Sequence, residues 1–158
     1  MLKRLLLAGV LVIVGVADGA AQPATTQASI GGLVTTIVPA GGVFVDGARA
    51  VLRTTSVVGE AQVFGAVGPE FVAMGGMRQH LVASSQGDIY VQLLFGGAIG
   101  YPQRCDLCGP RVAEMGAGAH IVLNRQWALQ IRGDIRGGGS AADLFYPTLG
   151  IGFTRRWR

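Results

Sequence analysis

Two cysteines in one short segment are the residues whose spacing most directly indicates chemistry. Cys105 and Cys108 form a Cys-x-x-Cys pair within residues 100–111. We expect a disulfide, because the N-terminus described below predicts export into oxidising conditions. A thioredoxin-type redox site would need a helix N-terminus after the pair to activate a thiolate, whereas Gly109 and Pro110 follow it. A zinc site would need two further ligands, which only a partner chain could supply.

A second group that could do chemistry contains ten ionisable residues in alternating positions of apolar segments. They are Asp46, Glu60, Glu70, Arg78, His80, Glu114, His120, Arg132, Asp134 and Arg136. Five acids, three arginines and two histidines can neutralise one another through buried pairs inside a narrow interior. The functional alternative makes His80 or His120 a general base for chemistry on lipids. Ser56 and the other serines lie at expected strand ends or turns, outside any evident nucleophile motif.

The elements that would position these residues are clearest at the end of the chain. In 127–136, Trp127, Leu129 and Ile131 alternate with Gln130 and Arg132, and the segment 145–157 alternates in the same way. Side chains of a β-strand point to opposite faces in turn, so each segment is predicted to be a strand with one apolar and one polar face.

The N-terminus predicts export. Lys3 and Arg4 precede an apolar run from residue 5 to 16, and small residues follow it. This order is typical of a secretory signal peptide, which we assign to residues 1–21, with cleavage after Ala21 or, alternatively, after Gly19. An uncleaved membrane helix is the other interpretation, but the apolar run is too short to span a bilayer comfortably.

Composition limits the class of protein. The chain has 13 basic and 9 acidic residues, of which Lys3, Arg4 and Asp18 lie in the signal peptide, so 11 and 8 remain and the net charge is +3. This charge is too small to indicate a nucleic-acid partner. The 26 glycines and the low charged fraction of 14% favour a β-rich exported protein of one domain.

Turn signals divide the rest of the chain into eight apolar-leaning segments. After a polar lead-in at 22–29, we place strands at 30–38, 43–52, 56–65, 70–81, 88–99, 112–123, 127–136 and 145–157. These lengths match tilted strands that cross a bilayer. The connections alternate between short turns and a second set that includes the two longest loops, 100–111 and 137–144. Outer-membrane barrels place short turns in the periplasm and longer loops outside.

The charges lie almost entirely on the parity opposite the large apolar residues, which predicts an apolar exterior. An interior that held the arginines, acids and histidines with many glycines would suit a small polar lumen. An eight-stranded barrel has only enough interior for side chains to fill, so we expect a filled lumen rather than an open pore. Arg49 breaks the parity, where we expect a bulge. The strand 30–38 shows no clear parity.

Aromatic residues gather near the ends of the expected strands. Trp127 and Trp157 lie near one end, and Tyr101, Phe145 and Tyr146 lie near the other. Aromatic girdles at the two membrane interfaces would produce this distribution, although strands favour aromatic residues in any sheet.

Several segments resemble the small outer-membrane β-barrel families, which include the OmpA transmembrane domain, OmpX and opacity-type proteins. The similar segments are 89–97 (IYVQLLFGG), 115–119 (MGAGA), 123–134 (LNRQWALQIRGD) and 149–157 (LGIGFTRRW). The resemblance implies that 149–157, with Phe153 and Trp157, is the closing strand, whose terminal aromatic signal is read by the barrel-assembly machinery. Trp127 in the preceding strand is expected to be an interface aromatic. Two features depart from the pattern: Arg158 follows the terminal aromatic, and Arg155 takes a parity that is usually apolar. Near a periplasmic interface both can reach the headgroups.

We therefore expect residues 30–158 to form an all-β domain, an eight-stranded antiparallel up-and-down barrel in the outer membrane of a Gram-negative-type bacterium. Its expected role is structural, or in surface recognition of a ligand through 100–111 and 137–144, with outer-membrane lipid around it. We expect no enzyme activity, cofactor, metal or nucleic acid. Two alternatives stay open: a lipid-modifying outer-membrane enzyme, and a soluble exported barrel that binds an apolar ligand.

Overall fold

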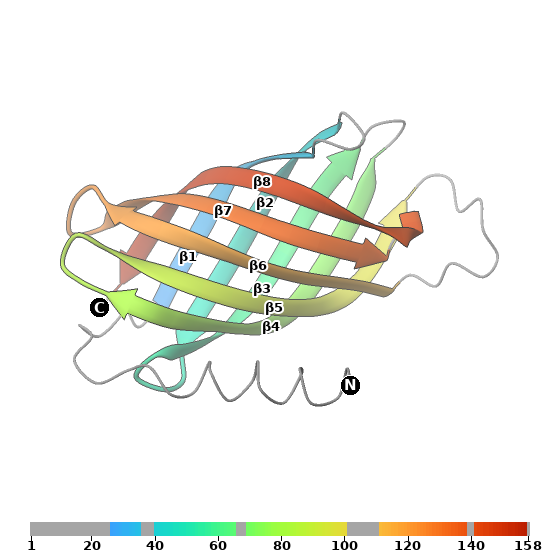
Figure 1. Ribbon diagram of the computed structural model, residues 1–158. Coiled ribbons are helices and arrows are strands. Elements are labelled where there is room, and N and C mark those ends of the chain that lie inside the picture. Colours follow the sequence, from blue (N-terminus) through green and yellow to red (C-terminus); the bar gives the residue numbers. More distant parts are fainter. Residues whose placement is uncertain (1–25, 36–39, 66–68, 101–110, 139–140, 158) are drawn as a thin grey trace.

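The eight strands close into one barrel (Figure 1), seen in a computed structural model of the chain. The structure describes residues 26–35, 40–65, 69–100, 111–138 and 141–157. Each strand pairs antiparallel with its sequence neighbours, and β1 pairs with β8 to complete the ring. The predicted eight-stranded antiparallel up-and-down barrel is confirmed.

The strands are 10 to 17 residues long. They are β1 (Thr26–Thr35), β2 (Ala40–Ala50), β3 (Thr55–Gly65), β4 (Glu70–Ala83), β5 (Gly87–Gly100), β6 (Arg111–Val122), β7 (Trp127–Gly138) and β8 (Ala141–Trp157). All eight overlap the strands expected from the sequence. No helix in the described part of the chain is long and apolar enough to cross a membrane.

The first strand differs from its prediction. β1 begins at Thr26 and ends at Thr35, so 26–29 belong to the sheet rather than to the polar lead-in at 22–29. Its parity is regular: Gln27, Ser29 and Leu33 are buried inside the barrel. Small residues obscured this pattern in the sequence. The expected signal peptide, 1–21, lies outside the described residues.

The two ends of the barrel differ. At one end, which we call the turn end, the short connections 51–54, 84–86 and 123–126 join the strands, β1 begins and β8 ends (Figure 1). At the opposite end, the loop end, strands are joined by segments that include 101–110 and 139–140. The expected long loop 137–144 is wrong, because 137–138 belong to β7 and 141–144 belong to β8. Hydrogen bonds within the turns hold the turn end, such as those from the amides of Gln126 and Trp127 to the Asn124 side chain.

The bulge expected at Arg49 is absent, because the pairing of β2 with β1 and β3 runs regularly through this residue. Arg49 simply points outward near the turn end. The register shifts elsewhere, between His80 and Val82 in β4 and between Arg136 and Gly138 in β7. Gly138 has a φ of 94°, a backbone conformation that glycine adopts without steric cost.

The faces of the sheet have opposite character. Large apolar side chains are exposed on the outside of all eight strands, for example Ile30 at 61%, Phe71 at 55% and Leu149 at 56%. Polar and charged side chains fill most of the inside. Apolar residues contribute two inner clusters, one around Val58 and Leu94 and the other formed by Leu33, Phe44 and Phe64.

Candidate functional site

All ten ionisable residues singled out from the sequence are buried inside the barrel. They are Asp46, Glu60, Glu70, Arg78, His80, Glu114, His120, Arg132, Asp134 and Arg136, and none is more than 7% exposed. They come from β2, β3, β4, β6 and β7, so the network draws on most of the wall. The strand parity that turns them inward also brings in the amide side chains Gln62, Gln92 and Gln130.

Arg132 of β7 is the centre of the network. Its Nη1 lies 2.7 Å from Glu60 Oε2, its Nε lies 2.6 Å from Asp134 Oδ2, and its Nη2 contacts Glu114 Oε1. Glu60 lies on β3, four strands away in a ring of eight, and therefore on the opposite wall. A single guanidinium thus connects the two sides of the lumen and pairs with three carboxylates.

Glu114 extends this centre toward the loop end. Both Nε and Nη2 of Arg136 donate to Glu114 Oε2, at 3.1 and 2.8 Å. Gln62 donates to the same oxygen at 3.2 Å and also contacts Glu60. The guanidinium groups of Arg132 and Arg136 lie over the rings of Phe44 and Phe64, at 5.0 and 5.6 Å from the ring centres, so aromatic faces cover the arginines.

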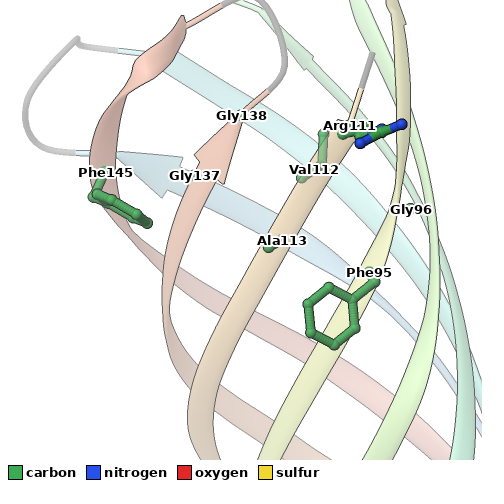
Figure 2. A pocket seen from close by; sticks show the side chains of 8 residues that line it. All are labelled: Phe95, Gly96, Arg111, Val112, Ala113, Gly137, Gly138 and Phe145. Carbon is green, nitrogen blue, oxygen red and sulfur yellow. The ribbon is translucent and has the colours of Figure 1, made fainter. Parts of the chain in front are cut away.

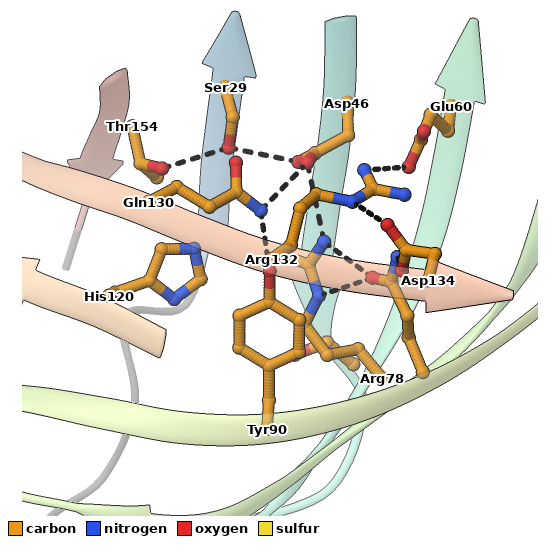
Figure 3. Close-up of polar contacts among 12 residues, drawn as sticks. Ser29, Asp46, Glu60, Arg78, Tyr90, His120, Gln130, Arg132, Asp134 and Thr154 are labelled. Carbon is orange, nitrogen blue, oxygen red and sulfur yellow. Dashed lines mark hydrogen bonds and ion pairs between the residues drawn. The ribbon is translucent and has the colours of Figure 1, made fainter. Parts of the chain in front are cut away.

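A second cross-barrel arrangement surrounds Asp46 of β2 (Figure 3). Asp46 pairs with Arg78 Nη2 at 3.3 Å and accepts hydrogen bonds from Ser29 at 3.0 Å and Gln130 at 3.2 Å. Gln130 also donates to the Tyr90 hydroxyl at 2.7 Å, and Arg78 lies 4.3 Å above the Tyr90 ring. Asp46 therefore connects residues from β1, β4 and β7.

Two glycines on the inner face of β6 make room for this packing. A Cβ at Gly118 would lie 2.4 Å from the Tyr90 hydroxyl oxygen and 2.8 Å from the Ile131 carbonyl oxygen. A Cβ at Gly116 would lie 1.9 Å from Asp134 Oδ1. The Met-Gly-Ala-Gly-Ala segment thus provides the space into which Tyr90 and Asp134 project.

Sequence reasoning missed a cluster near the turn end, centred on Asp88 of β5. Asp88 Oδ1 lies 3.1 Å from His80 Nδ1 and 2.9 Å from His120 Nδ1. Arg156 Nη2 lies 3.8 Å from Asp88 Oδ2. Asp88 is the first residue of the strand predicted at 88–99 and the second residue of β5, and it was not among the ten ionisable residues singled out. Its shared parity with Tyr90 and Gln92 was the signal that could have placed it inside.

Ser56 lies at the start of β3, as predicted, and it also belongs to this cluster. Its Oγ lies 3.2 Å from His80 Nε2, and His80 Nδ1 contacts Asp88. This Ser–His–Asp order resembles the contacts of a hydrolytic triad. However, Ser56 is only 2% exposed, and Asp88 divides its oxygen between two imidazoles.

The aromatic residues of the closing strands lie on the outside. Trp127, Phe153 and Trp157 are 39%, 55% and 41% exposed. Arg155 points outward between the two tryptophans, and its guanidinium lies 5.9 Å from the Trp127 ring and 5.3 Å from the Trp157 ring. The two tryptophans are therefore at the turn end, as the sequence predicted.

A shallow groove of about 320 Å³ lies on the outside near the loop end (Figure 2). Phe95 and Phe145 stand on either side of it, and Gly137 lies beneath the Phe145 ring. Arg111 lines the same groove. This groove is open to the surroundings of the barrel, and the lumen network is not part of it.

Cys105, Cys108 and most of 100–111 lie outside the described residues, so their expected disulfide stays a prediction. Within the part of the chain that the structure describes, no group of three or more His, Cys, Asp or Glu residues could hold a metal ion.

Comparison with solved structures identifies the architecture. A de novo designed transmembrane β-barrel matches with a TM-score of 0.67 and 14% identity, over 87% of this chain and 98% of the design. The N-terminal β-barrel domain of Pseudomonas aeruginosa OprF matches with a TM-score of 0.65 and 11% identity, over 86% and 100%. The Yersinia pestis outer-membrane protein Ail matches with a TM-score of 0.59 and 11% identity, over 85% and 99%.

No family model and no curated protein matches the chain. At these low identities the structural likeness shows the fold alone, a closed antiparallel β-barrel.

Proposed function

We propose that this chain is an integral outer-membrane protein whose closed barrel is a structural anchor and whose loop end faces the cell exterior. The observation that carries the proposal is the inverted distribution of side chains. The six acidic residues whose side chains the structure describes, Asp46, Glu60, Glu70, Asp88, Glu114 and Asp134, are all buried inside the barrel, while large apolar side chains cover the outside. A soluble exported barrel would have the opposite arrangement, so this distribution argues against that alternative.

The lumen contacts support a sealed rather than a conducting barrel. The Arg132–Glu60 pair spans opposite walls, and Gln62 of β3 reaches Glu114 of β6. The side chains of Arg78, Arg132 and Glu114 are at most 2% exposed. An eight-stranded barrel has an interior that side chains of this size can fill. Recognition at the surface would then fall to 100–111 and to the short connection between β7 and β8.

The experiment is electrophoresis of the protein recovered from outer membranes, with and without boiling. A closed barrel that resists detergent is expected to migrate at a different position before boiling, and the protein is expected to need detergent for extraction. In planar bilayers we expect no steady conductance. A protein that is soluble and monomeric without detergent would contradict the proposal.

A second candidate function, hydrolysis or acyl transfer on lipids, is favoured by one observation. The Ser56–His80–Asp88 contacts have the order that activates a serine nucleophile. Against it, the Ser56 side chain is buried within the strand wall and its cluster. We therefore rank this function second.

Labelling with a fluorophosphonate probe separates the two candidates, because the probe modifies activated serines. We expect no label on the folded protein in detergent. Labelling that disappears in Ser56→Ala and is retained in Ser84→Ala would reverse the ranking. Ser84 is a suitable control because it lies in the β4–β5 turn.

A further inference from the structure

The outward-facing ionisable residues share one sign of charge and lie mostly at one end of the barrel. Among the residues whose side-chain exposure the structure describes, they are all arginines: Arg49, Arg53, Arg111, Arg125 and Arg155. All except Arg111 lie at the turn end, in strands β2 and β8 and in the turns 51–54 and 123–126. The outer surface at this end therefore carries positive charge, since Asp88, the described carboxylate of this end, is buried in the lumen.

Strand pairing brings part of this charge into one continuous band. Thr26 of β1 pairs with Arg49 on one side and with Trp157 on the other. Two residues further along, Ala28 pairs with Arg155, which pairs in turn with Trp127. We call these outward residues of β7, β8, β1 and β2 the arginine band.

The centre of the band, on β1, carries small side chains. Thr26 lies between Arg49 and Trp157, and Ala28 lies between Gly47 and Arg155. The backbones of β8 and β2 are about 10 Å apart across β1, two strand spacings. Arg155 is held between the indole rings of Trp127 and Trp157, an arrangement that orients the guanidinium while its N–H groups can donate to an anion.

The next outward row toward the middle of the barrel is apolar. Ile30 pairs with both Val45 and Phe153, and these three side chains are 61%, 52% and 55% exposed. A molecule that contacts both rows must carry an anionic group next to hydrocarbon. The acyl chains of a phospholipid would lie against Ile30, and its phosphate would lie at the level of Arg49 and Arg155.

We propose that the arginine band binds the headgroup of an anionic glycerophospholipid in the leaflet at the turn end, an inference that rests on the proposed membrane function. Arginine matches phosphate oxygens through paired N–H donors. A zwitterionic phosphatidylethanolamine brings an ammonium group as well, and the outward residues described at the turn end include no carboxylate for that group. The band should therefore select phosphatidylglycerol over phosphatidylethanolamine.

Native mass spectrometry of the detergent-purified protein, equilibrated with equal amounts of the two lipids, tests this selection. The unmodified protein is expected to retain phosphatidylglycerol in preference. In R49Q/R155Q the ratio of the two bound lipids should fall about tenfold, toward the bulk ratio, since each basic residue near a headgroup surface adds to anionic lipid binding. R49K/R155K should keep part of the preference.

The matched control is R111Q, which removes an outward arginine at the loop end and should leave the ratio unchanged. Glycerol phosphate, a headgroup without acyl chains, should not displace bound phosphatidylglycerol. A ratio near one for the unmodified protein, an unchanged ratio in R49Q/R155Q, an equal loss in R111Q, or displacement by glycerol phosphate would overturn the proposal.

Heat-modifiable migration of each sample separates the two levels of inference. A folded, heat-modifiable protein without lipid preference contradicts only the arginine band, whereas loss of heat-modifiability in the unmodified protein contradicts the membrane barrel itself. If R49Q/R155Q fails to fold, the single variant R49Q serves instead, because Arg49 has no aromatic partner among the described contacts. An unchanged ratio in folded R49Q would then count against the band.

Discussion

Successive residues of β7 lie alternately on its outer and inner faces, and the two faces have opposite preferences for apolar and charged side chains. Ile131 is 45% exposed on the outside, and its neighbour Arg132 is 2% exposed on the inside. In a water-soluble protein the isoleucine would be buried and the arginine exposed. A bilayer reverses this preference for the outer face, because lipid tails are as apolar as the side chains that they contact.

This difference shows which face holds the contacts that specify how the strands are arranged in the barrel. In the proposed membrane location, the outer face would gain its favourable environment from lipid in any arrangement that keeps it outside. Specific contacts between distant strands lie on the inner face, such as Arg132–Glu60 and Gln130–Asp46. The inner network therefore has more to lose from a single substitution than the outer surface.

The largest expected effect comes from removing the arginine at the centre of the network. Arg132→Met leaves Glu60, Glu114 and Asp134 without their shared cation, and breaking a buried ion pair from one side costs about 3–5 kcal/mol. We expect a loss of this size in the free energy of unfolding, measured by urea titration in lipid vesicles with tryptophan fluorescence as the signal.

The matched control for that variant is Arg111→Met, which removes an exposed arginine from the outer face. Its expected change in the free energy of unfolding is within about 0.5 kcal/mol. If the two variants lost equal free energy of unfolding, the contacts of the inner network would not contribute more to stability than the outer surface does.

The next prediction places a charge on the outer face. Ile131→Arg puts a guanidinium near the middle of the lipid-facing band, where the cost is about 2–4 kcal/mol in the free energy of unfolding. Leu123→Arg, at the turn end, should cost at most about 1 kcal/mol because its charge can reach the headgroups. The same vesicle titration compares the two, and equal costs would mean that residue 131 does not face hydrocarbon.

The sequence carried enough information for the barrel because a period of two survives in nearly every strand. In β7 and β8 the alternation of large apolar and polar side chains leaves no ambiguity, and the structure confirms it. In β1, Gly31 and Gly32 add no side-chain signal, so the strand boundary was misplaced by four residues. Arg49 was misread as a bulge because a charge near a strand end can point outward at little cost.

The site was predictable as a set of residues but not as a set of pairs. Parity decides which side chains point inward, whereas the stagger of strands around the ring decides which of them meet. Glu60 and Arg132 are 72 residues apart, and nothing in the local sequence connects them. Ser56 meets His80 for the same reason: β3 and β4 pair Ser56 with Arg78, two residues before the histidine.

The smallest expected effect tests whether the two faces differ in packing as well as in charge. Gly118→Ala adds one methyl group on the inner face, where it would collide with Tyr90 and the β7 backbone. Overpacking of this kind costs about 1–3 kcal/mol. Gly59→Ala adds the same group on the outer face of β3, where no atom lies within 4 Å of the new Cβ. Because lipid can adapt to that methyl group, the second variant should keep the stability of the unmodified protein in the same vesicles. Equal stability of both variants would mean that the lumen is loosely packed, and it would remove the main support for a sealed barrel.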